Sequence, residues 1–291
     1  MGVELGIIFA FVAMFAWGVG DFFIQRSTRK FGDWETLFFI SLFGVIFLFP
    51  FVYKDIPTLF LSFDEKYLIL LAPSFTILIA ALFEFESLKR GKISVVEPLW
   101  SLEVPVSALA AFFILKEIPS TLQIILIITL LVGLVLVSLR SYHLEKKIWL
   151  EKAVIIGAFS AIIMGLANFL VGVGARETNA LIINWFLSTF LALACFIYLI
   201  SKKNLRKTFK DVIKNKKLLF SMCTLDNIAW VAFAFSMTLA PIALAVALSE
   251  SYIIIAVLLG LFVNKEYLRK HQKIGLIIAI ISAILLASLM T

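Results

Sequence analysis

The chain has 291 residues, of which 62% are hydrophobic and 15% are charged, and its mean hydropathy is +1.06. Soluble globular domains contain roughly 45–50% apolar residues, so this composition excludes an ordinary soluble enzyme and predicts an integral membrane protein. The formal net charge of +7 does not predict a nucleic-acid partner. The Lys and Arg residues lie between apolar runs, where such residues orient membrane helices.

Ten apolar runs follow one another along the chain, each close to the roughly 20 residues that cross ~30 Å of hydrocarbon as a helix. The polar segments between them are too short for a soluble catalytic domain. We therefore expect an all-α, multi-pass membrane protein, because a backbone in lipid must satisfy its hydrogen bonds internally. The predicted spans are Glu4–Gln25, Trp34–Tyr53, Tyr67–Leu88, Ile93–Leu115, Thr121–Arg140, Lys152–Gly174, Asn179–Ile200, Lys217–Thr238, Ile242–Val263 and Gln272–Met290.

Basic residues are distributed unevenly between the two sets of loops. Loops after odd-numbered spans carry most of the Lys and Arg residues, and the segment 201–217 is the most basic of them. Basic loops stay on the cytoplasmic side, so ten spans predict that both termini lie outside. We further expect a plasma-membrane protein whose partners are lipids and a small-molecule substrate, present as a monomer or homodimer.

The two halves of the chain resemble each other. The stretch WGVGDF at 17–22 aligns with MGLANF at 164–169, and LKE at 115–117 aligns with NKE at 264–266. Each half has five predicted spans, an odd number, so the second copy must enter the membrane from the opposite side. The sequence thus predicts an inverted repeat, an architecture of many secondary transporters, with halves 1–145 and 146–291.

This pattern resembles the EamA family of the drug/metabolite transporter superfamily over the whole chain. The residues that carry the resemblance are Trp17-Gly18 in the first span, Pro98 and Pro105 in the fourth, and Glu117 and Glu266 after the fourth and ninth. The resemblance implies ten transmembrane helices arranged as two inverted five-helix repeats around a central cavity. It also implies a secondary transporter of small polar or amphipathic molecules, without ATP, cofactor or bound metal. It does not identify the substrate.

The fourth span carries two carboxylates in an otherwise apolar stretch. On a continuous helix, Glu97, Trp100 and Glu103 fall within about 120° of arc. An acid–indole–acid face suits an organic cation, because carboxylates supply charge and the ring face attracts cations. Glu97 lies closer to the interface, where it can pair with Lys92 or take part in proton coupling, whereas Glu103 is too deep for such a pair.

Two further acids lie near mid-membrane. Glu250, beside Tyr252 in the ninth span, would cost a few kcal/mol if it were charged and faced lipid. We predict that Glu250 binds substrate and exchanges protons, and it is the most favoured single site residue. In the eighth span, Asp226 and Trp230 are also predicted to contact substrate, since no basic residue near in sequence can pair with Asp226.

The first span repeats this acid–aromatic spacing in reverse order, with Trp17 four residues before Asp21. The two side chains share one helix face. Asp21 is predicted to be either a cavity-facing proton or cation site or an interfacial carboxylate paired with Arg26 or Lys30. Both readings remain open from the sequence.

Other acids are predicted to be structural. Glu84 and Glu86 stand before Lys89 and Arg90, which favours local ion pairs at the interface, with Glu86 slightly preferred if either is functional. Glu117 precedes the fifth span, where a carboxylate can cap the positive end of the helix dipole.

The deep charges are nearly all negative, and no Lys or Arg lies deep in a span. This pattern favours a cationic or zwitterionic metabolite, an amine or amino acid, exported in exchange for protons, over sugar phosphates. The predicted substrate-binding residues are Glu250, Glu103, Asp226, Trp100, Trp230, Trp17 and Tyr252. The predicted proton-coupling residues are Glu250, Asp21 and Glu97. No catalytic residue, metal site or cofactor is expected.

Two alternatives stay open. One is facilitated diffusion of another polar metabolite. The other is an intramembrane aspartyl protease, because Gly18-Val19-Gly20-Asp21 spells the GxGD motif of those enzymes. The second Asp of that mechanism, in a Tyr-Asp pair, is missing from the sequence, which places the protease far behind the transporter.

Overall fold

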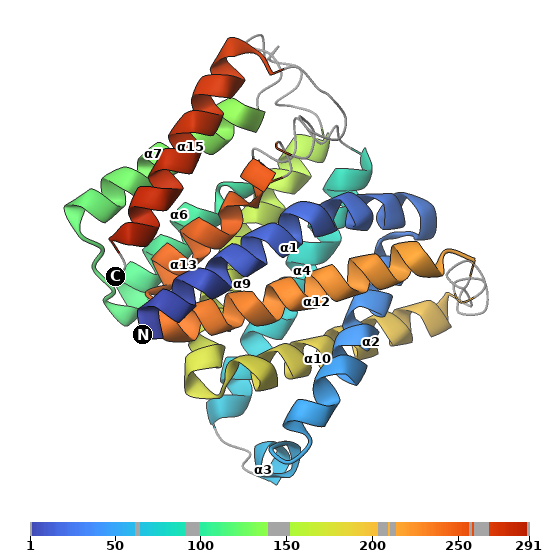
Figure 1. Ribbon diagram of the computed structural model, residues 1–291. Coiled ribbons are helices and arrows are strands. Elements are labelled where there is room, and N and C mark those ends of the chain that lie inside the picture. The colour runs from blue at the N-terminus through green and yellow to red at the C-terminus, as the bar shows by residue number, and fades with distance from the viewer. Residues whose placement is uncertain are drawn as a thin grey trace.

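The computed structural model describes residues 2–61, 65–90, 99–138, 152–202, 209, 214–255, 258 and 268–289, and these contain helices and no strand. Labels follow Figure 1. The helices are α1 (Gly2–Phe31), α2 (Asp33–Val52), α3 (Ile56–Leu61), α4 (Glu65–Arg90), α6 (Glu103–Ala110), a π-helical turn (Ala111–Leu115), α7 (Thr121–Ser138), α9 (Lys152–Glu177), α10 (Ala180–Ser201), α12 (Lys216–Leu239), α13 (Ile242–Ser249), a 3₁₀ turn (Glu250–Tyr252) and α15 (Lys270–Ser288).

Seven of these helices are long and apolar enough to cross a membrane: α1, α2, α4, α9, α10, α12 and α15. The other three predicted spans fall on shorter apolar helices at Glu103–Leu115, Thr121–Val137 and Ile242–Ile255. The all-helical membrane fold is therefore confirmed, and the number of ten crossings stays a prediction. The short helix α3 between the second and third spans was not predicted.

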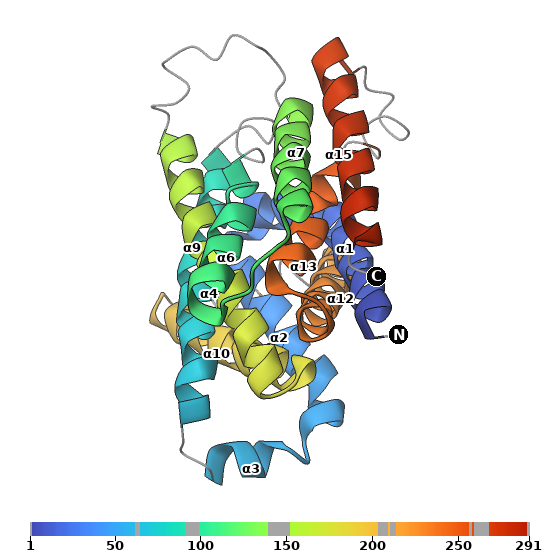
Figure 2. The same ribbon diagram turned by 90° about the vertical axis from the view of Figure 1, so that its left-hand side faces the viewer.

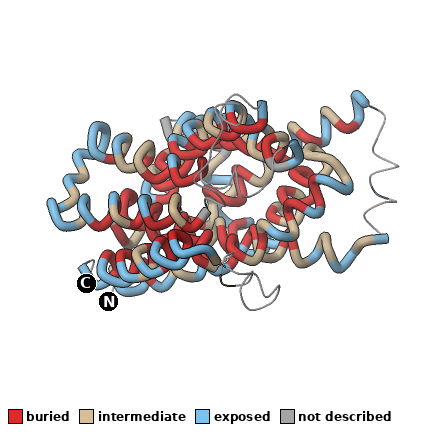
Figure 3. Tube along the Cα trace, turned by 90° about the horizontal axis from the view of Figure 1, so that it is seen from above, coloured by how far each residue is buried: buried red, intermediate tan, exposed pale blue. Residues whose placement is uncertain are grey.

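The helices bury small and large apolar residues between them and also turn large apolar side chains outward. Buried positions gather where helices meet, and exposed positions follow the outer sides of the bundle (Figure 3). Leu68, Ile197 and Ile46 expose 66–69% of their surface, which suits contact with lipid chains. The first and last described helices end near each other in both views (Figures 1 and 2).

Helix packing follows the internal repeat. The most extensive pairs are α1 with α12, α4 with α9, α7 with α15, and α2 with α10, followed by α6 with α9, α1 with α13, α2 with α12, α6 with α13 and α4 with α10. Exchanging the first five spans for the last five turns the α1–α12 pair into α9–α4, the α6–α9 pair into α13–α1 and the α2–α12 pair into α10–α4. The remaining pairs map onto themselves. This exchange is what a pseudo-twofold relation between the two halves produces.

The fourth and ninth spans both lose regular α-helix at matching positions. In the fourth span a turn at Ser101–Leu102 precedes α6, which begins at Glu103. In the ninth span α13 ends at Ser249, and the 3₁₀ turn Glu250–Tyr252 follows. Broken helices at this depth are tolerated where they line a cavity, and they mark binding sites in transporters with inverted repeats. The described part of the fourth span is therefore not the continuous α-helix that the predicted arc assumed.

The fifth and tenth spans, α7 and α15, form a pair that contacts the rest of the described chain mainly through α13 (Figure 2). Their backbones approach at Gly133 and Gly275. A Cβ atom at Gly133 would lie 2.7 Å from the backbone nitrogen of Ala279 and 2.9 Å from the carbonyl oxygen of Gly275. These are backbone atoms, which cannot rotate away, so the pair depends on glycine for close approach.

We expect Gly133→Ala to destabilise the protein by about 1–3 kcal/mol, the usual cost of an overpacked contact. The measurement is the apparent melting temperature of purified protein in detergent. Val132→Ala, at the adjacent exposed position of α7, serves as the matched control and should melt like the parent. An unchanged melting temperature for Gly133→Ala would contradict the close approach of α7 and α15.

A polar network at the end of the fourth span joins three other elements. The Arg176 guanidinium of α9 pairs with Oε1 of Glu117 at 2.5 Å and donates to the carbonyl oxygens of Met237 and Ala240 at 2.8 and 2.9 Å. Oε2 of Glu117 accepts the backbone N–H of Ile242 at 2.9 Å. Arg176 thus binds the last carbonyls of α12 while Glu117 caps the first turn of α13.

This geometry corrects the prediction that Glu117 caps the fifth span. The first turn of α7 uses Ser120 and Gln123 instead, each side chain accepting the backbone N–H of the other residue at 3.3 and 2.8 Å. The capping chemistry was foreseen, but the capped helix begins 125 positions further along the chain.

Candidate functional site: an acidic cavity between the two halves

A cavity lies between the two halves of the chain, with about 910 Å³ of space that no atom occupies, part of it open to the surroundings. Its lining comes from α1, α2, α4, α6, α9, α10, α12 and the 3₁₀ turn of the ninth span. Both halves contribute, whereas α7 and α15 supply none of the described lining residues. The chamber therefore sits at the repeat interface, where transporters of this architecture hold their substrates.

Two acids from the broken spans meet across one amide. The side-chain nitrogen of Asn168, on α9, donates to Oε2 of Glu103 at 3.0 Å and to Oε1 of Glu250 at 3.2 Å. Glu103 exposes 5% of its surface, Glu250 6% and Asn168 1%. A single neutral amide thus links the two carboxyl groups and holds them toward the same space. It supplies hydrogen bonds without neutralising their charge.

Three more acids line the cavity from other helices: Asp21 on α1, Glu84 on α4 and Asp226 on α12. Glu84 is within electrostatic range of Glu103, Glu250 and Asp226, so these carboxyl groups form one connected set. Among the described residues that line the cavity there is no Lys, Arg or His. Adjacent carboxylates in a low-dielectric space repel one another strongly, and the chamber is therefore complementary to positive charge.

An aromatic wall adjoins the acids. The ring of Trp17 meets Trp230 edge-to-face at 5.4 Å, Phe233 at 5.0 Å and Tyr252 at 6.4 Å between centroids. Trp17, Trp230 and Tyr252 line the cavity. Rings of this kind attract cations through their faces and cover hydrocarbon through their area, so the wall suits an amine with an apolar stem.

The reversed spacing in the first and eighth spans has a structural explanation. Helices α1 and α12 run antiparallel, since Gly6 packs against Ala240 whereas Gly20 packs against Leu225. Trp17 and Trp230 therefore occupy one level of the pair. Asp21 and Asp226 lie one helical turn further along, at the next level of the same two helices.

Most of the predicted site residues are brought together in this cavity. Glu250, Glu103, Asp226, Asp21, Trp230, Trp17 and Tyr252 all line it. Trp100 does not: it exposes 2% of its surface within the apolar core and is not among the lining residues. Glu97 lies outside the described residues. Substrate binding and proton coupling by these side chains stay predictions.

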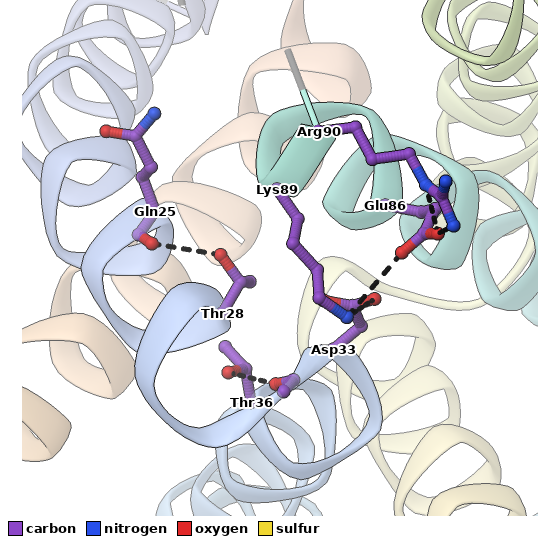
Figure 4. Close-up of polar contacts among 8 residues, drawn as sticks. Gln25, Thr28, Asp33, Thr36, Glu86, Lys89 and Arg90 are labelled. Atoms are coloured by element: carbon purple, nitrogen blue, oxygen red, sulfur yellow. Dashed lines mark hydrogen bonds and ion pairs between the residues drawn. The ribbon is translucent and has the colours of Figure 1, made fainter. Parts of the chain in front are cut away.

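Sequence reasoning missed Glu84 and Asn168. Glu84 and Glu86 are two positions apart, about 200° around α4, so they cannot face the same way. Glu86 pairs with Arg90 and with Lys89, which also bridges to Asp33 of α2 at 3.5 Å (Figure 4). The preference for Glu86 over Glu84 was therefore wrong.

Asn168 had one signal in the sequence. It occupies the position that aligns with Asp21 in the second repeat, although it carries no charge. An Asn at mid-membrane must also satisfy its hydrogen bonds inside the bundle. The structure shows that it does so with the two central acids.

The family model of the EamA-like transporter family matches residues 4–139 and 151–288, one copy in each half. The chain belongs to the EamA-like transporter family. This EamA-like protein is therefore a multi-pass membrane protein of a family whose members transport small solutes, and the resemblance drawn from the sequence is confirmed. The predicted division at residue 145 falls between the two matched copies.

A search of curated proteins gives no match to this EamA-like chain. A solved structure titled only "Crystal structure of protein" superposes with a TM-score of 0.73 at 13% identity, over 98% of this chain and 96% of that chain. At that identity the likeness concerns the fold alone.

None of the three comparisons supports the protease alternative. The first glycine of its motif has a packing role, because a Cβ atom at Gly18 would lie 2.9 Å from the carbonyl oxygen of Tyr252.

Proposed function

We propose that this EamA-like protein is a secondary active transporter of a small cationic or zwitterionic metabolite, an amine or amino acid, in the plasma membrane. We further propose that the protein exports this metabolite in exchange for protons. The observation that carries it is the convergence of Glu103, Glu250 and Asp226 on one chamber that has no basic side chain among its described lining residues. Buried acids of this kind mark ion and proton pathways in membrane proteins.

Glu250 is proposed to alternate between substrate and proton. A carboxylate in this low-dielectric chamber is stabilised by a bound ammonium group or by protonation, and the two occupants exclude each other at one oxygen pair. The 3₁₀ turn that carries Glu250 and the turn before Glu103 place both acids at helix breaks. Rocking of the two halves around this fixed site would then expose it to either side in turn.

The test uses purified protein in liposomes with an imposed pH gradient and labelled amines, amino acids and sugar phosphates. We expect amines or amino acids to accumulate against their gradient only while the pH gradient lasts, with collapse on adding a protonophore. Sugar phosphates should not accumulate. Transport that equilibrates without responding to pH would favour facilitated diffusion, and preference for sugar phosphates would overturn the proposal.

A further inference from the structure

One carboxyl group in the cavity stands apart from the amide bridge. Asp226 exposes 7% of its surface, faces the cavity, and makes no hydrogen bond or ion pair with any residue that the structure describes. A carboxyl group removed from water without such a partner is costly. Asp226 is therefore available as an acceptor for a cation that enters the cavity.

Glu84 connects Asp226 with the other acids. Its carboxyl group is within electrostatic range of Asp226 on α12 and also of Glu103 and Glu250. The negative charge thus extends from the amide-bridged pair to the separate Asp226 site. A substrate with a single ammonium group would satisfy one end of this set and leave the other end without a counter-charge.

A zwitterion fits this distribution less well. The carboxylate of an amino acid would enter a chamber with five acidic side chains and no basic side chain among its described lining residues. The side-chain nitrogen of Asn168, a donor that lines the cavity, already donates to Glu103 and Glu250. The substrate's own carboxylate would therefore face repulsion that no described cation offsets.

We infer that the cavity takes a diamine or longer polyamine, with one ammonium group between Glu103 and Glu250 and another at Asp226 and Glu84. The hydrocarbon stem packs against Trp17, Trp230 and Tyr252, whose rings line the same chamber. This inference rests on the proposed function and narrows its cationic or zwitterionic class to dications. Protons remain the exchange partner.

The experiment compares binding of unbranched α,ω-diamines with monoamines of the same chain length, for example diaminobutane with butylamine, to purified full-length protein in lipid nanodiscs. For the best chain length, we expect the diamine to bind at least tenfold more tightly, since a charged hydrogen bond contributes roughly 1.5–3 kcal/mol, or about tenfold or more in affinity. Asp226→Asn should remove that advantage.

Glu84→Gln is the second variant and should also reduce the ratio of diamine to monoamine affinity. Glu86→Gln is the matched control, because Glu86 lies on the same helix and is paired with Arg90 outside the cavity. It should keep the parent ratio. The elution volume and melting temperature of each variant establish that it is folded, and Glu84→Gln keeps the test decisive if Asp226→Asn fails to fold.

The possible failures are distinguishable. Equal affinity for diamines and monoamines at every chain length, or tighter binding of amino acids, overturns the dication inference and leaves the proposed transporter of amines or amino acids standing. Binding of neither amines nor amino acids overturns both. An unchanged affinity ratio in both Asp226→Asn and Glu84→Gln overturns the placement of the second ammonium group.

Discussion

Glu250→Gln is expected to abolish proton-driven accumulation of substrate in liposomes. Glutamine has nearly the shape of glutamate, and its side-chain oxygen can still accept the hydrogen bond that Asn168 donates at 3.2 Å. The fold should therefore survive. The amide neither carries charge nor exchanges a proton in the physiological range, so the chamber loses the group proposed to alternate between its two occupants.

The matched control is Glu177→Gln, which neutralises an exposed acid at the end of α9. It should accumulate substrate at the parent rate. Substrate exchange across the membrane without a pH gradient separates coupling from binding, because a variant that has lost only coupling can still exchange. Accumulation at the parent rate by Glu250→Gln would remove Glu250 from the mechanism.

Arg176→Ala is expected to destabilise the protein by removing the centre of a polar network. Its guanidinium pairs with Glu117 and donates to the carbonyl oxygens of Met237 and Ala240, so removal leaves a carboxylate and two carbonyl groups without their partner. The side chains of Arg176 and Glu117 expose 30% and 18% of their surface. Solvent therefore screens part of the loss, and we expect about 2–3 kcal/mol.

A double-mutant cycle with Glu117→Ala isolates the contribution of the pair. Each single variant should lower the apparent melting temperature by roughly 5 °C. The double variant should be more stable than the sum of the two losses predicts, because the residues share one network. Strict additivity would show that Arg176 and Glu117 act independently. Lys116→Ala, a neighbouring exposed cation, is the control for loss of charge alone.

The sequence alone determined the class of the protein and the regions of the chain that matter. Apolar runs of membrane length must form helices, because lipid offers no partner to backbone groups. Each acid deep in an apolar run indicated a candidate functional site, because a carboxylate is costly to place in lipid unless it faces a cavity or a partner. The repeat followed from aligned short stretches and an odd number of spans per half. These arguments need only local spacing, and they selected Glu103, Asp226 and Glu250, which the structure brings to one cavity.

Tertiary structure decided which side chains meet. Local spacing gives the angle between two residues on one helix, but it does not say which side of that helix faces the cavity. That is why Glu86 was preferred to Glu84, and why Glu117 was assigned to the helix next in sequence instead of α13. Nor does local spacing show the turn at Ser101–Leu102 that interrupts the fourth span, or the burial of Trp100 in the apolar core.

Local spacing along the sequence does not predict the contact between Asn168, Glu103 and Glu250. This contact joins residues 65 and 82 positions apart, and it exists only because α9 packs between the two broken spans. The composition determined that the chain lies in lipid and that it forms helices, because a backbone in lipid must satisfy its hydrogen bonds internally. The chamber itself depends on how helices from two oppositely inserted halves are rotated against one another, which packing alone sets.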